Sequence, residues 1–74
     1  QRVFNEAQIG RVLDVLVSGR GRRPGQAHGR SPYLQAVHFM DERARDGEIV
    51  QVRIVGASQN SLTGERVSAQ AEVA

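Results

Sequence analysis

The sequence predicts an all-β fold, a small antiparallel barrel of five short strands that follows the end of a helix. Ten of the 74 residues are valine, a β-branched residue that suits a pleated sheet better than a helix. Short apolar segments recur about every ten residues, with turn-forming residues between them. Because a chain of this length is too short for two full sheets, a single closed barrel is favoured.

The first residues favour a helix. Residues 1–8 contain neither glycine nor proline, and Val3 and Phe4 precede Ala7 and Gln8 by four positions, the spacing of neighbours on one helix face. This segment is shorter than the ~12 residues that an isolated helix needs. We therefore predict that residues 1–8 are the end of a helix arriving from upstream, and that the barrel occupies residues 9–74.

The first two predicted strands flank a loop. Residues 9–17 are rich in β-branched side chains and place most apolar residues on one alternating face, which Arg11 interrupts. Residues 18–25 contain three glycines, one proline and no apolar residue, so they are predicted as a loop. Residues 27–30 form the second strand, in which Gly29 allows a sharp bend or the close approach of another backbone.

Turns separate the remaining three predicted strands. Residues 34–39 follow a Ser-Pro turn, alternate between two faces and form the third strand. Residues 41–47 are charged and end in Asp-Gly, a turn dipeptide. Residues 48–55 show the clearest alternation of apolar and polar side chains in the chain and form the fourth strand. Residues 62–69 form the fifth, with Gly64 as a bulge or bend.

Positive charge is concentrated in one part of the chain. All ten basic residues are arginine, whose planar guanidinium binds phosphate through two hydrogen bonds and stacks on bases. Residues 15–40 carry four arginines and no acid, whereas residues 41–74 carry six acids against four arginines. Such a local positive region is typical of a contact surface for a polyanion. The composition of the source genome is an alternative explanation for the absence of lysine.

Six residues in this basic region are predicted to contact RNA. Arginines beside a glycine-rich turn bring both side chains and backbone N–H groups to phosphates, and a histidine nearby can stack on a base or contact a phosphate. Since single-stranded sites usually use several aromatic platforms, a single tyrosine favours contacts with the RNA backbone over base reading. A solvated loop without a ligand is the alternative. The predicted residues are Arg20, Arg22, Arg23, His28, Arg30 and Tyr33.

No catalytic or metal site is predicted in this chain. It has no cysteine and therefore forms no disulfide and no thiolate metal site. Its two histidines stand ten residues apart without a third ligand, and His38 is predicted as a packed strand residue. The arginine-rich loop lacks the Lys-Ser or Lys-Thr of a phosphate-binding P-loop. No segment approaches the ~20 apolar residues of a membrane helix, so we expect a cytoplasmic protein without a membrane partner.

Several short motifs, taken together, resemble the TRAM domain, a small OB-like antiparallel barrel appended to RNA-modifying enzymes. Each motif is weak alone, but their order and spacing cover nearly the whole chain. The motifs are Ile9-Gly10-Arg11-Val12, Val15-Leu16-Val17, Gly29-Arg30, Val37-His38-Phe39, Gly47-Glu48-Ile49-Val50-Gln51-Val52 and Asn60-Ser61-Leu62-Thr63-Gly64.

Within this family the chain looks most like the C-terminal domain of the radical-SAM tRNA methylthiotransferases, which act on isopentenyladenosine next to the anticodon. Phe4 and Asn5 look like the end of the helix that joins the radical-SAM domain to the TRAM domain. The resemblance implies that the chain is not itself an enzyme, and that it docks the tRNA anticodon stem-loop for its own catalytic domain upstream. It also implies that the parent enzyme holds iron–sulfur clusters and S-adenosylmethionine outside this chain.

Two alternatives stay open. The barrel could be a structural cap packed on the catalytic domain, marked by apolar residues such as Val3, Phe4 or Leu34 on its exterior. It could also be the TRAM domain of another RNA-modifying enzyme or of the ribosomal-protein methylthiotransferase. Those ribosomal-protein enzymes usually carry an acidic segment after Gly-Arg, where this chain has residues 31–36 without an acid.

Overall fold

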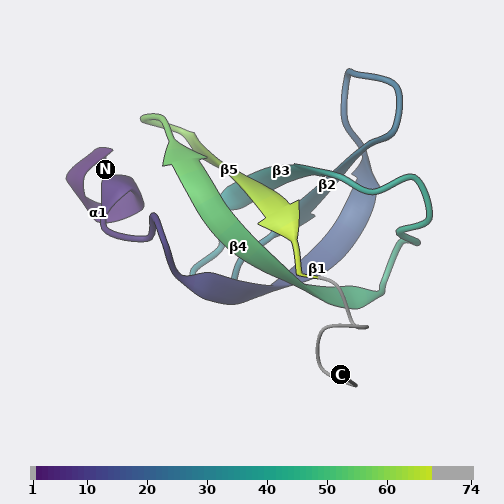
Figure 1. Cartoon of the computed structure of the whole chain (residues 1–74), viewed down its shortest axis with the longest axis horizontal. Helices are drawn as coiled ribbons and strands as arrows, with labels where there is room; N and C mark the ends of the chain where they lie inside the picture. The colour runs from purple at the N-terminus through teal and green to yellow at the C-terminus, as the bar shows by residue number, and fades with distance from the viewer. Residues whose placement is uncertain (1, 68–74) are drawn as a thin grey trace.

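Five strands close into a barrel in the computed structural model of the chain, which describes residues 2–67 (Figure 1). Around the barrel the strands follow the order β1-β2-β3-β5-β4. The predicted five-stranded barrel with a short helix before it is thereby confirmed. The elements are α1 (Arg2–Glu6), β1 (Val12–Arg20), β2 (Gln26–Arg30), β3 (Ala36–Met40), β4 (Ile49–Ala57) and β5 (Ser61–Arg66).

One pairing departs from the predicted antiparallel arrangement. Four of the five pairings are antiparallel, and β3 pairs with β5 in parallel. Strand directions cannot alternate all the way round a closed ring of five, because an odd number leaves two neighbours that run the same way. The parallel pairing of β3 with β5 is therefore a consequence of closure. The predicted antiparallel arrangement holds for the other four pairings.

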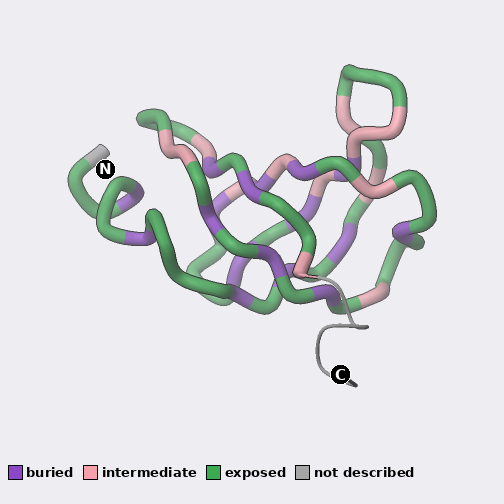
Figure 2. The backbone as a smooth tube through the Cα atoms, in the orientation of Figure 1, coloured by how far each residue is buried: buried purple, intermediate pink, exposed green. Residues whose placement is uncertain are grey.

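Alternate residues of each strand point into the barrel and form one core. In β1 and β4 every second side chain is buried, which is the period-two pattern of a sheet with one covered face (Figure 2). Across this pair Val15 lies opposite Val50, and Leu13 lies opposite Val52. The buried apolar residues are Leu13, Val15, Val17, Ala27, Val37, Phe39, Ala44, Val50, Val52, Ile54 and Leu62.

Gly29 permits a close approach of two backbones inside this core. A Cβ atom at Gly29 would lie 2.5 Å from the carbonyl oxygen of Leu16 and 2.6 Å from Cγ1 of Val15. The close approach predicted at this glycine is confirmed. The predicted irregularity at Gly64 lies on its partner strand instead, since the bulge falls between Ile54 and Gly56 of β4 and Gly64 pairs with Ile54.

Strand boundaries differ from the predicted ones at several ends. β1 begins at Val12 rather than at Ile9, whose side chain is half exposed in a turn, and it continues to Arg20. The continuation is possible because a bulge after Val17 keeps the last residues of β1 paired with β2. The predicted loop of residues 18–25 therefore shrinks to residues 21–25. Residues 68 and 69 of the predicted fifth strand lie outside the described part of the chain.

A buried polar network fixes α1 to one end of the barrel. The Asn5 side chain is 1% exposed, and its Nδ2 donates to the carbonyl oxygens of Ser58 (2.8 Å) and Gln59 (3.1 Å). Its Oδ1 accepts from Nε2 of Gln35 at 2.6 Å, and the Ser31 hydroxyl donates to Oε1 of Gln35 at 2.9 Å. One asparagine thus joins the helix to the β4–β5 turn and to the β2–β3 connection.

The helix is shorter than predicted, since it ends at Glu6 and a turn follows. None of the described residues forms a helix long and apolar enough to span a membrane.

Candidate nucleic-acid interface

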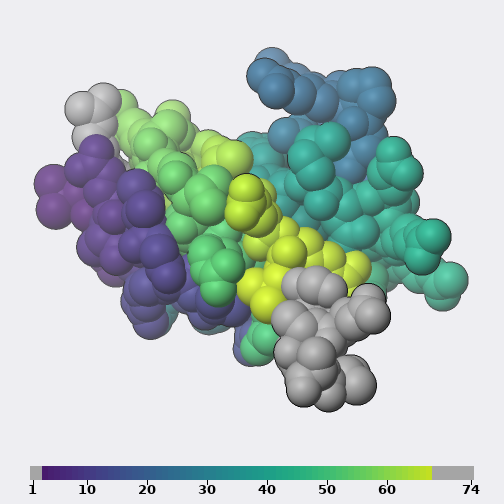
Figure 3. Space-filling model, in the orientation of Figure 1, coloured from purple at the N-terminus to yellow at the C-terminus, as the bar shows by residue number. Residues whose placement is uncertain are grey.

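The loop of residues 21–25 projects from the barrel beside a shallow groove on its outer surface (Figure 3). We call this loop the arginine loop and the hollow the arginine groove. The groove crosses strands β1, β2, β3 and β5, so it lies over the sheet face on which the arginine loop stands. Its lining residues are Arg20, Gly21, Arg22, Arg23, Gln26, His28, His38 and Thr63.

Hydrogen bonds around Gln26 hold the arginine loop in place. The Gly21 N–H donates to the carbonyl oxygen of Gln26 at 2.8 Å, and the Gln26 N–H donates to that of Arg23 at 3.0 Å. Gly25 takes a φ of 79°, in the left-handed region that glycine adopts without strain. This short, bonded turn leaves Arg22 and Arg23 exposed, and within residues 2–67 neither forms an ion pair.

Arg20 is engaged with the protein itself. Its guanidinium donates to the carbonyl oxygens of Ala44 at 3.0 Å and Asp41 at 2.8 Å, so it braces the turn that follows β3. Arginine has five N–H donors, and these two bonds leave others on the side chain that borders the groove. Arg20 therefore combines a structural role with a place at the edge of the groove.

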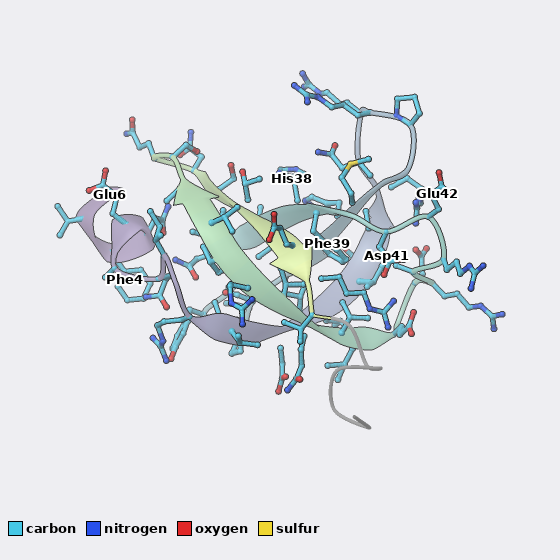
Figure 4. The ribbon with its side chains drawn as sticks, viewed as in Figure 1. Phe4, Glu6, His38, Phe39, Asp41 and Glu42 are labelled. Atoms are coloured by element: carbon cyan, nitrogen blue, oxygen red, sulfur yellow. The ribbon has the colours of Figure 1, made fainter. Side chains whose placement is uncertain are left out.

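Two histidines form the floor of the groove. His28 and His38 face each other across the β2–β3 pair, with ring centroids 4.9 Å apart and ring planes tilted by 45°. Figure 4 shows His38 on the outer side of β3, whereas its neighbour Phe39 points into the barrel. Along the same outer row, the Ser18 hydroxyl lies 3.3 Å from Nδ1 of His28 and Thr63 lies opposite His38.

The surroundings of His28 oppose its protonation. Partial burial lowers the pKa of His28 below its ordinary value of 6.5, and the positive charges of His38 and Arg30 lower it further. The residues that line the groove include three arginines and two histidines but no carboxylate. The groove is therefore positively charged through its arginines, and His28 stands in it as a largely neutral ring at pH 7.

Arg30 and Tyr33 lie away from the groove. They follow the far end of β2, where Nη1 of Arg30 donates to the carbonyl oxygen of Leu34 at 3.2 Å. The Tyr33 ring meets Phe4 edge to face with centroids 5.7 Å apart, and the guanidinium carbon of Arg11 lies 5.9 Å from the Tyr33 centroid. RNA contacts by Arg30 and Tyr33 stay a prediction.

The structure thus brings together four of the six predicted RNA-contacting residues, Arg20, Arg22, Arg23 and His28. No local sequence pattern indicates the other side chains of the groove. His38 is predicted from the sequence as a packed strand residue, but in the structure it is only partly buried. The strand register identifies His38 as a groove residue, because His38 pairs with His28 across the antiparallel β2–β3 ladder.

Within residues 2–67 no group of three or more His, Cys, Asp or Glu side chains is placed to hold a metal ion. Asp41 instead forms an ion pair with Arg66 of β5.

Comparison with known proteins identifies the domain. Residues 6–67 match the TRAM domain family. A tRNA-2-methylthio-N(6)-dimethylallyladenosine synthase of Cereibacter sphaeroides (strain ATCC 17025) is 51% identical over 67 residues, which are 90% of this chain and 15% of that protein. The proteins of the same name from Maricaulis maris and Novosphingobium aromaticivorans are 53% and 47% identical, each over 86% of this chain and 14% of their own length.

These relatives are much longer than the chain, which spans about 15% of the length of the relatives it matches. The family match covers the five strands and the last residue of α1, and the barrel agrees with it. The chain therefore belongs to the TRAM domain family.

Proposed function

We propose that this chain is the RNA-docking domain of a tRNA methylthiotransferase, and that its arginine groove binds the backbone of the tRNA anticodon stem-loop. The observation that carries the proposal is the groove itself, which gathers three arginines and two histidines without an acid. In OB-like barrels, the face of strands 2 and 3 and the loop between strands 1 and 2 bind oligonucleotides. The arginine groove and the arginine loop occupy these positions.

The domain would act by positioning the tRNA stem-loop. Contacts with phosphates fix the register and orientation of a nucleic acid without reading its sequence. Arg22 and Arg23 offer such contacts from a turn held by backbone hydrogen bonds, so the backbone loses little conformational freedom when RNA binds. A stem-loop held in this way presents its target adenosine to an active site elsewhere in the polypeptide, which lowers the entropic part of the barrier.

The chemistry would belong to the rest of the enzyme. Methylthiolation of isopentenyladenosine by a radical-SAM domain requires iron–sulfur clusters and S-adenosylmethionine. This chain has no cysteine to ligate a cluster, so these cofactors would be held by the upstream catalytic domain. Helix α1 would then be the end of the helix that connects the two domains.

Replacing Arg22 and Arg23 by alanine tests the docking proposal. Each arginine–phosphate contact contributes a salt slope of roughly −0.7 in log affinity for single-stranded RNA. Loss of two contacts should therefore weaken binding of an anticodon stem-loop about tenfold at about 0.15 M salt and reduce the slope by about 1.4. The affinity is measured by fluorescence anisotropy over a range of salt concentrations, with the full polypeptide that contains the chain.

Arg43→Ala together with Arg45→Ala is the matched control. Both arginines are exposed and border a different surface, so the variant makes the same change in net charge outside the groove. Its affinity and salt slope should stay close to those of the unmodified protein. Equal losses in the two double variants, or no loss in the first, contradict the proposal.

A structural cap is the second candidate function, and an apolar depression lined by residues of β1, β4 and the β2–β3 connection favours it. Leu34 and Ile49 are 76% and 66% exposed there, and Leu16, which pairs with Ile49, lines the same hollow. Exposed apolar clusters of this kind mark contact surfaces between proteins or domains. The partner would be the catalytic domain of the same polypeptide.

A Leu34→Asn, Ile49→Thr variant separates the cap from RNA docking. Leu34 has a φ of 68°, a conformation that asparagine tolerates better than leucine, so the barrel itself should keep its stability. If the depression packs on the catalytic domain, the full polypeptide should melt about 5 °C lower, since each buried leucine or isoleucine contributes roughly 1.5–3 kcal/mol. Unchanged melting with normal RNA affinity contradicts the cap.

A further inference from the structure

The two groove histidines offer a binding function that arginine alone cannot supply. Arginine is always charged, whereas histidine changes its charge near neutral pH. His28 and His38 lie ring to ring, 4.9 Å apart, on the outer face of β2 and β3. Both rings are partly exposed to the groove, so a ligand in the groove reaches them.

The charged residues that line the groove around the pair are all positive. Two acids stand outside this lining: Glu65 follows Thr63 by two residues on the exposed face of β5, and Glu42 lies beside Gly25 of the arginine loop. Among the groove residues, the arginine loop contributes Arg22 and Arg23, and β1 contributes Arg20. The uncharged Ser18 hydroxyl of β1 lies beside His28. The residue that faces His38 from β5 is Thr63, which is also uncharged. On β2 itself Arg30 lies two residues after His28. These cations oppose a proton on His28 while the groove holds no bound anion.

A phosphate reverses this balance. A phosphodiester carries one negative charge, and an opposite charge close to an imidazole favours its protonated form. The protonated ring then donates hydrogen bonds from both nitrogens, and its bond to a phosphate oxygen is charge-assisted. The Ser18 hydroxyl can accept from Nδ1 of His28, which leaves Nε2 as the donor to the ligand.

We propose that His28 and His38 form, with Arg22 and Arg23, a subsite for one phosphodiester group of RNA, and that the histidine pair takes up one proton from solvent when the phosphate binds. This inference rests on the proposed docking function and adds a proton-linked site to it. No covalent bond changes, because the only transfer is of a proton from water to an imidazole nitrogen.

The direction in which RNA affinity changes with pH follows from the pKa of His28 in the free and in the RNA-bound groove. In the free groove the pKa of His28 lies below 6.5 for the reasons given above, and a bound phosphate raises it. Binding therefore takes up a proton at pH values between the free and the bound pKa, and affinity rises as the pH falls through this window. Uptake of one proton limits the slope to a tenfold change in affinity per pH unit.

The test compares the unmodified protein with a His28→Gln, His38→Gln variant. Glutamine keeps a hydrogen-bonding side chain but does not titrate. The dissociation constant of a labelled anticodon stem-loop is measured at pH 6.0 and 8.0 with the full polypeptide that contains the chain. We expect the unmodified protein to bind about tenfold more tightly at the lower pH, and the variant to lose most of this difference. At pH 8.0 the two proteins should bind within about threefold of each other.

Calorimetry gives a second readout that needs no variant. Binding heats measured in two buffers with different ionisation enthalpies yield the number of protons taken up, which should lie between about half and one near pH 6.5. If the glutamine variant keeps the full pH dependence, or if no proton is taken up, the subsite is overturned while the docking function stands. If Arg22→Ala with Arg23→Ala leaves RNA affinity unchanged, the docking function itself fails.

Discussion

Gly29→Ala is expected to lower the free energy of unfolding of the 74-residue chain by about 3 kcal/mol, because an added methyl group overlaps fixed atoms of the core. Its Cβ would lie 2.5 Å from the carbonyl oxygen of Leu16, a backbone atom within the β1–β2 pairing, and 2.6 Å from Cγ1 of Val15. Val15 is fully buried, so neither atom can move away freely. A domain of this size has a stability of roughly 4–11 kcal/mol, and the loss is a large part of it.

The measurement is urea denaturation followed by circular dichroism, with Gly56→Ala as the matched control. Gly56 is also a strand glycine, but a Cβ there meets only Cβ of Thr63 at an ordinary 3.8 Å. Its substitution should change stability by less than about 1 kcal/mol. A stability of Gly29→Ala equal to that of the control would show that β1 and β2 do not approach as closely as described.

Asn5→Leu is expected to cost about 3 kcal/mol, because leucine fills a similar volume but leaves buried polar groups without partners. The Nε2 of Gln35 loses its acceptor inside the protein, and the carbonyl oxygens of Ser58 and Gln59 lose their donor. Each unsatisfied buried group costs roughly 1–3 kcal/mol, and the carbonyls near solvent cost less because water replaces the amide.

Glu6→Leu serves as the control for Asn5→Leu. Glu6 is exposed in the same helix, so its substitution should change the stability by no more than about 0.5 kcal/mol. Both variants are compared by thermal unfolding. Equal midpoints for the two would mean that the helix is not anchored to the barrel through Asn5.

Most of the fold could be predicted from local patterns. The alternation of apolar and polar residues in residues 48–55 corresponds directly to one buried and one exposed face of β4. Strand ends were less predictable, because the extension of β1 to Arg20 depends on a bulge and on pairing with β2. The polar network of Asn5 and Gln35 joins residues 30 positions apart, and no local pattern indicates such a contact.

The candidate site was predicted in part. The glycine-rich arginine segment correctly indicated an exposed basic loop, because Arg22 and Arg23 are held there by local turn geometry. Arg30 follows Gln26 by four residues along β2, which at ~3.3 Å per residue carries it roughly 13 Å from the loop. The engagement of Arg20 with Asp41 and Ala44 is a tertiary contact that the sequence pattern does not contain.

The place of β5 in the ring has a consequence for the synthesis of the protein. β5 is the last strand of the described chain, yet it hydrogen-bonds both β3 and β4. On the ribosome, the four earlier strands emerge with two unpaired edges, and such edges readily pair with other chains. The barrel can close only after Arg66 has left the exit tunnel, so this domain is completed only when its last strand has emerged, through pairings distant in sequence, which form slowly.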